Sequence, residues 1–327
     1  MAACTSNPYT FTSIPTMSIL VCGSMAFDTI MVFQDQFKRH ILPDQIHILN
    51  VSFFVPEMRR EFGGCAGNIA YNIHLLGGDA RIMATVGEDS GPYRERLTKL
   101  KIDQRFMRTI EGTYTAQAFV TTDLDHNQIT AFHPGAMMQS HLNKVQDAAE
   151  GVKLGIVGPD GLEGMLTHCR NFADAHIPFI FDPGQGLPIL SGEDLLTCLE
   201  QATYCTVNDY EAKLVCDKTG LTIEAVAERV RGLIVTLGAQ GSRIYENGKI
   251  IEVACARETE LLDPTGCGDA YRGGLLYGLS QDWSLEKSAK LASLMGAIKI
   301  AHRGGQNHQP SQAEIATRFA ENYGEQL

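Results

Sequence analysis

The feature that most restricts how this chain can fold is a regular alternation of apolar runs and helical patterns after about residue 152. Short apolar runs typical of buried strands lie at 154–157, 179–181, 204–207 and 232–237, with helical patterns between them at about 161–175, 191–201 and 209–230. Repeated strand–helix–strand units bring parallel strands together in one sheet with helices on its faces. Ser18–Gly23 adds another short apolar run, closed by glycine. The chain is therefore predicted to have an α/β fold around a mostly parallel sheet.

Two segments interrupt this pattern with strands that no amphipathic helix connects. Thr29–Phe33 and Ser52–Val55 look like strands within residues 29–62. Residues 113–133 contain two strand-like runs separated by a polar turn, which is typical of a hairpin. Such segments can meet in space as one small sheet beside the main fold. We therefore predict a discontinuous β lid formed by about 29–62 and 113–133.

The composition is that of a soluble globular protein, with 44% hydrophobic and 20% charged residues among 327. The net charge of -11 argues against nucleic-acid binding, which needs a basic surface, and no apolar run approaches the ~20 residues of a membrane span. Nine scattered cysteines without a Cys-x-x-Cys pair favour a reducing, cytoplasmic location.

Residues 1–16 lack the features of a secretory signal. We expect them to be disordered, to precede an alternative start or to derive from expression, followed by one domain over 17–327.

A glycine-rich turn at 263–269 carries the clearest chemical signal. Gly266, Cys267 and Gly268 lead directly into a helical pattern that has Asp269 in its first turn. Glycines let backbone N–H groups converge on one point, and the start of a helix adds the positive end of its dipole, so the turn is suited to an anion such as phosphate. Asp269 is either an ordinary helix-start residue or a group that takes part in chemistry. The turn alone does not decide between these two roles.

A second glycine pair, Gly63-Gly64, precedes a helical pattern that contains Asn68. The exposed backbone of two glycines allows a ligand to approach closely, and the amide of Asn68 can bond neighbouring hydroxyls, although a helix-capping role is the alternative. Asp28 follows the first strand, where open α/β sheets bind ligands, and an ordinary turn aspartate is an equal alternative. Together these residues are candidates for binding a substrate that carries hydroxyl groups.

Phosphoryl transfer from a nucleotide fits these groups. Asp269 would accept the proton of a hydroxyl while the N–H groups of Gly266–Gly268 stabilise the charge on the transferred phosphate. Asn208 and Glu211 begin a helix about one turn apart and could organise water around Mg²⁺, the alternative being a capping box. Nucleotide contacts are predicted in a loop after a strand, against the alternative of a plain turn, at Thr236, Gly238 and Gly241.

The two glycine-rich turns together resemble the two signatures of the ribokinase (PfkB) family of carbohydrate and nucleoside kinases. Gly63, Gly64 and Asn68 are similar to its N-terminal signature. Residues 263–269 are similar to its C-terminal signature, Asp-Thr-Gly-Ala-Gly-Asp, with a proline inserted after the first aspartate and cysteine in place of alanine. Asn208-x-x-Glu211 resembles the family's Asn-x-x-Glu motif. The matches occur in the expected order along nearly the whole chain.

The resemblance implies a ribokinase-like three-layer α/β/α fold with a small β-sheet lid, and it implies ATP and Mg²⁺. The corresponding site residues would be Asp269 as catalytic base, Asp28, Gly63, Gly64 and Asn68 at the substrate, and Asn208 and Glu211 at the metal and phosphates. Many members of this family also bind a monovalent cation such as K⁺ near the second signature. Asp263 and Thr265 are the candidates for that role here.

The lid segments contain more aromatic area than a bare sugar needs. Phe53, Phe54, Phe119, Phe132 and His133 either form a wall for a purine base or pack as the core of the lid. The chain most resembles bacterial members that phosphorylate nucleosides such as adenosine, inosine and guanosine at the 5′-hydroxyl. The favoured function is therefore ATP-dependent 5′-phosphorylation of a purine nucleoside.

Two alternatives stay open from the residues. One is a kinase for a free sugar such as ribose or fructose, and the other is a catalytically silent sensor of sugars or nucleosides. The intact Gly266-x-Gly268-Asp269 argues against the sensor. A dinucleotide oxidoreductase is disfavoured because the turn after the first strand lacks the glycine fingerprint. The expected partner is a small molecule rather than nucleic acid or a membrane, and the protein is expected to be a monomer or a homodimer.

Overall fold

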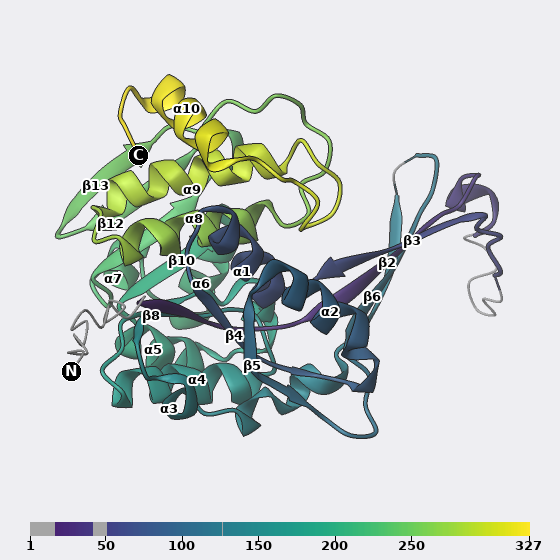
Figure 1. The fold of residues 1–327 in the computed structure, drawn as a ribbon, viewed down its shortest axis with the longest axis horizontal. Helices are drawn as coiled ribbons and strands as arrows, with labels where there is room; N and C mark the ends of the chain where they lie inside the picture. Colours follow the sequence, from purple (N-terminus) through teal and green to yellow (C-terminus); the bar gives the residue numbers. More distant parts are fainter. Residues whose placement is uncertain (1–16, 42–50, 126) are drawn as a thin grey trace, which may run out of the picture.

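The structure, a computed structural model, describes residues 17–41, 51–125 and 127–327, so the predicted extension 1–16 lies outside the described residues. A nine-stranded sheet runs through the molecule in the order β13-β12-β11-β10-β9-β8-β1-β4-β5 (Figure 1). Its strands are β1 (Ser18–Cys22), β4 (Ala80–Val86), β5 (Asp103–Thr109), β8 (Val152–Val157), β9 (Phe179–Phe181), β10 (Tyr204–Asn208), β11 (Gly232–Thr236), β12 (Ser242–Glu246) and β13 (Lys249–Val253). Neighbours from β5 to β11 are parallel, and the β12–β13 hairpin adds two antiparallel strands at one edge.

Helices cover both faces of this sheet, and the predicted three-layer α/β/α fold is confirmed. One face carries α1 (Cys65–Leu75), α2 (Gly91–Leu100), α8 (Cys267–Ser280) and α9 (Leu285–Lys299), with α10 (Gln312–Tyr323) packed outside α9. The other carries α3 (Val145–Ala148), α4 (Leu162–Asp174), α5 (Gly192–Gln201), α6 (Asp209–Thr219) and α7 (Ile223–Ala227). Every residue of β1 is buried because helices pack on both of its sides. In the described part of the chain, no helix is long and apolar enough to cross a bilayer.

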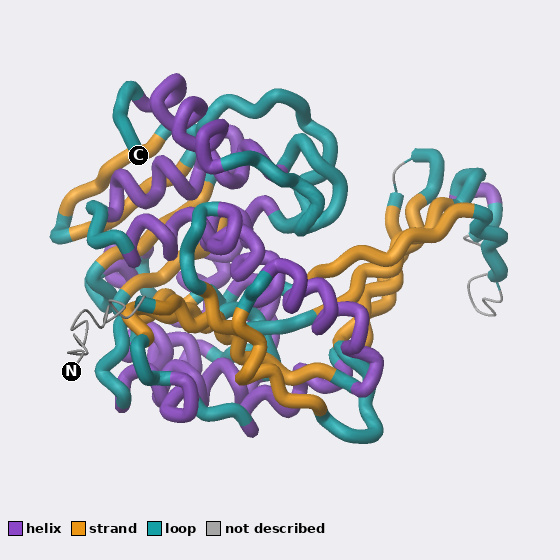
Figure 2. The backbone as a smooth tube through the Cα atoms, viewed as in Figure 1, coloured by secondary structure: helices purple, strands orange, loops and turns teal. Residues whose placement is uncertain are grey.

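A second, smaller sheet projects from one end of this body (Figures 1 and 2). Its order is β3-β2-β6-β7, with bounds β2 (Ala26–Val32), β3 (Glu57–Gly63), β6 (Ala116–Thr122) and β7 (Gln128–His133). β2 pairs antiparallel with β3 and parallel with β6, so strands from both predicted lid segments lie in one sheet. The small sheet starts at the end of the loop after β1, which places it beside the strand ends of the large sheet.

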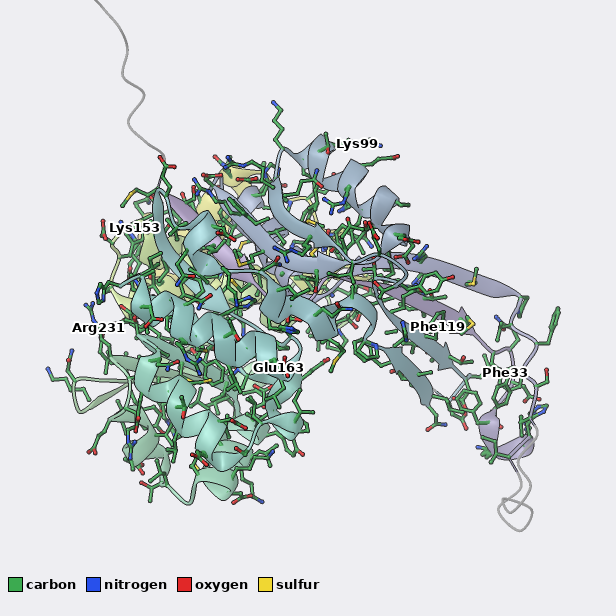
Figure 3. The ribbon with its side chains drawn as sticks, turned by 90° about the horizontal axis from the view of Figure 1, so that it is seen from below. Phe33, Lys99, Phe119, Lys153, Glu163 and Arg231 are labelled. Atoms are coloured by element: carbon green, nitrogen blue, oxygen red, sulfur yellow. The ribbon has the colours of Figure 1, made fainter. Side chains whose placement is uncertain are left out.

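Aromatic side chains cluster at the far end of the small sheet. The ring of Phe53 lies 4.8 Å from that of Phe33 and 5.0 Å from that of Phe37, measured between centroids. Figure 3 shows Phe33 near this end, away from the body of the molecule. Phe53 therefore packs as part of the core of the small sheet, which was the alternative to a role at the substrate.

Two details of the predicted secondary structure are wrong. Ser52–Val55 forms no strand, and the strand of this segment is Glu57–Gly63. That strand has a charged sequence and mostly accessible side chains, so it lacks the apolar pattern by which strands are predicted. The predicted helix 209–230 is divided into α6 and α7, because Gly220 takes a left-handed conformation (φ 73°) that ends α6.

Candidate active site

The second glycine turn forms the start of α8. Gly266 is the N-cap and has a φ of 77°, a left-handed conformation that favours glycine. The N–H of Cys267 donates to the carbonyl of Pro264 at 3.1 Å, so a bound anion would rely on the next N–H groups of the first turn. Burial raises the pKa of the Cys267 thiol to about 11, which makes it a poor nucleophile.

The first glycine turn forms the start of α1 in a similar way. Gly64 is its N-cap, with a φ of 83°, and a Cβ there would lie 2.5 Å from the nitrogen of Ala26 and 2.6 Å from the carbonyl oxygen of Ser24. Only glycine fits this close approach of two backbone segments. The turn places Asn68 in the first turn of α1, where its side chain is almost completely buried. Asn68 therefore points into the protein beside the strand ends.

The two glycine turns meet through one hydrogen bond. Asn68 Nδ2 donates to Asp269 Oδ2 at 2.8 Å, although the residues are 201 positions apart. Burial raises the pKa of Asp269 to about 6, assisted by the charges of Asp182 and Asp28 and opposed by the bond from Asn68 and the charge of Arg272. A carboxyl group with this pKa is ionised at neutral pH and still able to take a proton, as a general base must be.

Asp28 follows the first strand as predicted, but it lies inside β2 and not in a turn, which was the alternative. The chain enters the small sheet earlier than expected, so Asp28 is the third residue of a strand of that sheet. Its carboxylate fills space left by Gly63, since a Cβ at Gly63 would overlap it. Burial, with the charges of Glu61 and Asp263, raises the pKa of Asp28 to about 6. The charge of Asp28 also raises the pKa of Asp269, so the two carboxylates are close enough to interact.

A chain of hydrogen bonds that the sequence did not predict fixes the orientation of Asn68. Gln306 Nε2 donates to Asn68 Oδ1 at 3.0 Å and to Tyr93 Oη at 2.6 Å. Tyr93 Oη in turn donates to the carbonyl of Gly63 at 2.8 Å. Since Asn68 Oδ1 accepts from Gln306, its Nδ2 is the atom that faces Asp269.

The sequence contains one signal that could have revealed this network. Gly304-Gly305 precedes Gln306 and forms a third glycine pair. A Cβ at Gly305 would lie 2.6 Å from Asn68 Oδ1, so the backbone must approach the amide closely. Arg96 Nε donates to Gln306 Oε1 at 3.1 Å and holds the amide from its other side. None of these contacts could be assigned before the fold was known.

At the start of α6, Asn208 and Glu211 form the capping box that the sequence offered as the alternative role. Asn208 Oδ1 accepts from the N–H of Glu211 at 2.8 Å, and Glu211 Oε2 accepts from the N–H of Asn208 at 2.8 Å. Glu211 also lies 4.0 Å from Arg272, which makes two hydrogen bonds to Asp182, at 2.8 and 3.0 Å. Burial and the charge of Asp182 raise the pKa of Glu211. Asp182 and Arg272 are charged, buried residues of this region that the sequence did not reveal.

The residues predicted to contact a nucleotide lie beside this capping box. Thr236 is the last residue of β11 and pairs in register with Asn208 at the end of β10. Gly238 begins the short turn Gly238–Gln240 with a φ of 57°, and Gly241 ends it with a φ of 89°. The structure therefore brings these four residues together at one edge of the large sheet, where ligands bind in open α/β folds.

The oxygens of Asp263, one of the residues predicted for a monovalent cation, already accept hydrogen bonds. Asp263 Oδ1 accepts from the N–H of Thr265 at 2.9 Å, and its Oδ2 accepts from the N–H of Gly304 at 2.8 Å. The carbonyl of Asp263 accepts from Lys299 Nζ at 2.7 Å. Each oxygen of Asp263 thus already accepts a hydrogen bond. The donor to its carbonyl oxygen is the ammonium group of Lys299.

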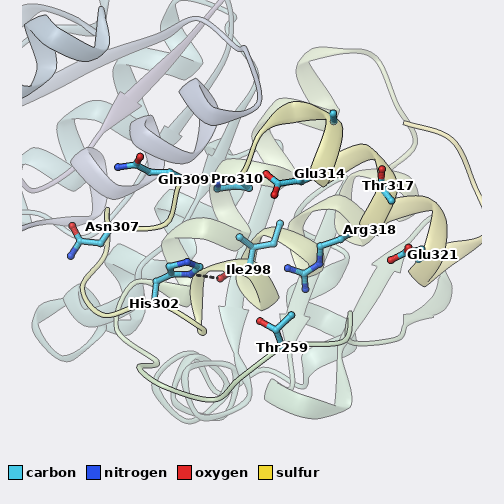
Figure 4. Close-up of a pocket in the computed structure, with 11 residues that line it drawn as sticks. Thr259, Ile298, His302, Asn307, Gln309, Pro310, Glu314, Thr317, Arg318 and Glu321 are labelled. Atoms are coloured by element: carbon cyan, nitrogen blue, oxygen red, sulfur yellow. Dashed lines mark hydrogen bonds between the residues drawn. The ribbon is translucent and has the colours of Figure 1, made fainter.

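A pocket of about 810 Å³ is lined by other residues. It is formed by α10, the end of α9 and the segment after it, and it includes His302, Asn307 and Arg318 (Figure 4). It contains none of the residues predicted for catalysis or for nucleotide binding. The candidate active site is instead the place where the starts of α1 and α8 meet, beside the small sheet.

Comparison with known proteins connects this arrangement to a family. The pfkB family of carbohydrate kinases matches residues 28–312, a range that includes both glycine turns and the groups described above. This chain belongs to the pfkB family of carbohydrate kinases. As a member of this family it is a phosphotransferase that uses an alcohol group as acceptor.

Several similar proteins are nucleoside kinases. The structure of the Burkholderia thailandensis nucleoside kinase in complex with inosine is 53% identical in sequence, has a TM-score of 0.85, and covers 94% of this chain and 99% of that one. The same enzyme in complex with ADP-inosine has a TM-score of 0.82 and 54% identity. A nucleoside kinase of Methanocaldococcus jannaschii is 32% identical over 273 residues, which are 83% of this chain and 89% of that protein.

Proposed function

We propose that this protein transfers the γ-phosphoryl group of ATP to the 5′-hydroxyl of a purine nucleoside. The observation that carries the proposal is the hydrogen bond between Asn68 and Asp269, which joins the two glycine turns at 2.8 Å. It unites a base, a substrate-binding amide and the start of a helix in one small space. A hydroxyl that bonds to Asn68 would lie within reach of Asp269, and a phosphate at the start of α8 would lie next to it.

Asp269 is the general base in this proposal. Its carboxylate takes the proton of the 5′-hydroxyl while the 5′-oxygen forms a bond to the γ-phosphorus. The bond between that phosphorus and the bridging oxygen breaks, and ADP leaves with the electron pair. The N–H groups in the first turn of α8 stabilise the negative charge on the transferred group, together with the positive end of the helix dipole. Gly266 and Gly268 allow the backbone to approach the phosphate closely.

The nucleotide and Mg²⁺ are assigned to the edge of the sheet that holds the capping box. In the described residues, no cluster of three or more His, Cys, Asp or Glu side chains could hold a metal ion. This suits Mg²⁺, which keeps several water ligands and binds mainly to phosphate oxygens. Glu211 would orient the water ligands of the bound Mg²⁺, which would supply positive charge to the phosphates. Asn208, Thr236, Gly238 and Gly241 would contact the nucleotide.

The sugar of the nucleoside is assigned to Asp28, Gly63, Gly64 and Asn68. Asp28 and Asn68 would bond its hydroxyl groups, since a carboxylate accepts and an amide both donates and accepts. The glycines leave room for the sugar beside the backbone. This arrangement also serves a free sugar, so the sugar site does not by itself select a nucleoside.

The register of the small sheet supports a place for the base. Asp28 on β2 pairs with Ala118 on β6, and Ala118 pairs with Phe132 on β7. Residues paired across strands point to the same face, so Phe132 shares the face of Asp28 and is 53% exposed. Phe119 pairs with Ala131 and points to the opposite face. An exposed ring on the substrate face suits a purine base, and Phe132 is the residue to which we assign this contact.

The relatives support the same acceptor. The Burkholderia thailandensis enzyme is named a nucleoside kinase, and its structures contain inosine and ADP-inosine. Eight free cysteines among the described residues agree with a reducing, cytoplasmic location, which we propose together with a monomeric or homodimeric state.

The test is a measurement of ADP formation with ATP, Mg²⁺ and a panel of acceptors. We expect turnover with inosine, adenosine and guanosine at low acceptor concentration and little turnover with ribose or fructose. Turnover with free sugars alone would replace this proposal with the sugar-kinase alternative. A protein that binds nucleosides but forms no ADP with any acceptor would support the silent sensor.

A further inference from the structure

One buried charge near the second glycine turn has no part in the reaction proposed above. Lys299, the last residue of α9, is fully buried, and its Nζ donates to the carbonyl of Asp263 at 2.7 Å and to that of His302 at 3.0 Å. Lysine is rarely buried to this extent, because its ammonium group loses its hydration. These two bonds tie the beginning of the glycine turn to the segment after α9.

Both partners of Lys299 belong to segments that shape the candidate active site. Asp263 begins the turn that ends at Asp269, and the segment after His302 carries Gln306, which orients Asn68. Burial lowers the pKa of Lys299, and the charges of Cys267, Asp263 and Asp269 oppose that lowering. Its Nζ donates to two carbonyl groups, as an ammonium group does, so it places a positive charge beside the beginning of the turn that is proposed to hold the phosphate.

The same position is the one at which a monovalent cation was expected from the sequence. Such a cation needs carbonyl and carboxylate oxygens that face it. The carboxylate oxygens of Asp263 accept backbone N–H groups, and its carbonyl accepts from Lys299. A second positive charge on this carbonyl would be repelled by the ammonium at close range.

We propose that the ammonium group of Lys299 takes the place of a monovalent cation at the second glycine turn, so that the protein needs neither K⁺ nor Na⁺. Its charge compensates the carbonyl groups behind the turn and holds the first turn of α8 in the conformation that receives the phosphate. The proposal rests on the proposed kinase reaction only for its effect on turnover. Its effect on stability is independent of the substrate.

The first test uses the unmodified protein in chloride salts of choline, Na⁺, K⁺ and Rb⁺ at equal ionic strength. Melting temperature and turnover with inosine and ATP are measured in each salt. We expect the same melting temperature in every salt and turnover rates within about twofold of each other. All four salts screen charges to the same extent at equal ionic strength, and the proposal leaves no site for a specific cation. Turnover that requires K⁺, or a melting temperature that K⁺ raises and choline does not, would overturn the proposal.

The second test compares Lys299→Ala and Lys299→Met with Lys287→Ala. Lys287 lies on the same helix, with its Nζ 4.3 Å from the ring centroid of Trp283, so its removal controls for loss of a lysine from α9. In choline we expect Lys299→Ala to melt lower and to lose at least about 10-fold in turnover, because the N–H groups of the turn are then held less well for the phosphate. K⁺ should restore part of the melting temperature and part of the turnover in Lys299→Ala. It should restore neither in Lys299→Met, because the methionine side chain fills the space that the lysine leaves.

The remaining outcomes also decide whether Lys299 takes the place of a monovalent cation. Lys299→Ala with the turnover of the unmodified protein in choline would contradict the role of the charge. A loss in Lys299→Ala that no cation restores would leave Lys299 as a packing residue and overturn the proposal. If both Lys299 variants fail to fold, the salt series on the unmodified protein gives the answer alone. Absence of kinase activity in the unmodified protein would count against the proposed function, and the melting temperatures would still test Lys299.

Discussion

Asp269 is placed where its negative charge is disfavoured. Burial raises its pKa to about 6, so the folded protein binds a proton at this position more readily than the unfolded chain does. Because of this difference in pKa, Asp269 contributes most to the free energy of unfolding at acidic pH, and the contribution is lost as pH rises through about 6. At neutral pH the ionised carboxylate therefore opposes folding. A carboxylate buried at this cost to stability is typical of a group that takes part in chemistry, as proposed for Asp269.

Replacing Asp269 by asparagine should separate its effect on catalysis from its effect on stability. We expect turnover to fall by roughly 10²–10⁴-fold, the usual contribution of a general base. The same substitution should raise the free energy of unfolding at neutral pH by about 1–3 kcal/mol, because it removes a disfavoured charge and keeps an acceptor for Asn68. Denaturant titration and steady-state kinetics measure both. Asp174→Asn, on an exposed residue of α4, is the control and should change neither quantity, and near-normal turnover in Asp269→Asn would exclude the base.

The pH dependence of kcat/KM follows from the same carboxyl. Activity should fall as pH decreases through about 6, because Asp269 must be deprotonated to act. Asp28 has a pKa raised to a similar value, so the acid limb belongs to the pair rather than to one residue. The bond from Asn68 lowers the pKa of Asp269, so Asn68→Ala should move the acid limb to higher pH as well as weaken substrate binding. An acid limb that moves to lower pH in this variant would contradict the assigned contact.

Phe132 and Phe119 offer a matched pair on opposite faces of the small sheet. Phe132→Ala should raise KM for inosine by about 5- to 150-fold, since stacking of a base on an aromatic ring contributes roughly 1–3 kcal/mol. Phe119→Ala removes a similar ring from the other face and should leave KM nearly unchanged. Equal effects of the two substitutions would show that the register of β6 and β7 does not decide base binding. Figure 3 shows Phe119 on the small sheet.

Among the elements, the glycine turns that start α1 and α8 determine the geometry of the site. Gly64→Ala should lower the free energy of unfolding by about 3 kcal/mol or more, because it combines a left-handed conformation with a collision against the backbone of Ala26 and Ser24. Gly220 has a similar φ of 73° but nothing near its Cβ position. Gly220→Ala should therefore cost only roughly 1 kcal/mol. Urea unfolding of the two variants measures the difference, and equal losses would contradict the close approach at Gly64.

The sequence predicts those elements whose pattern comes from burial. The apolar strands of the large sheet and the glycine turns could be located because buried faces and backbone turns leave a mark on the residues. β3 could not, because its side chains are largely accessible and its sequence is charged. Tyr93, Gln306 and Arg272 could not be assigned to the site either, since their roles depend on contacts between segments distant in the chain. Asp28 was predicted as a site residue but misplaced by the early start of β2.

At the scale of the whole molecule, the candidate site depends on contacts between the two ends of the chain. Asn68 lies near the beginning, Asp269 and Gln306 lie near the end, and the large sheet between them brings the starts of α1 and α8 together. The small sheet contributes Asp28 on β2 and Phe132 on β7. This arrangement assigns the acceptor hydroxyl, the base and the phosphate site to one place, which is the basis of the central claim that a nucleoside receives its phosphate on the 5′-oxygen.

Phosphorus NMR of the product formed from inosine and ATP tests this claim most directly. A phosphate on the 5′-oxygen couples to the two protons of the 5′-methylene group and gives a triplet, whereas a phosphate on the 2′- or 3′-oxygen couples to a single proton and gives a doublet. We predict a triplet from a new nucleoside monophosphate that grows together with ADP. A doublet, or consumption of ATP only when a free sugar replaces inosine, would contradict the account.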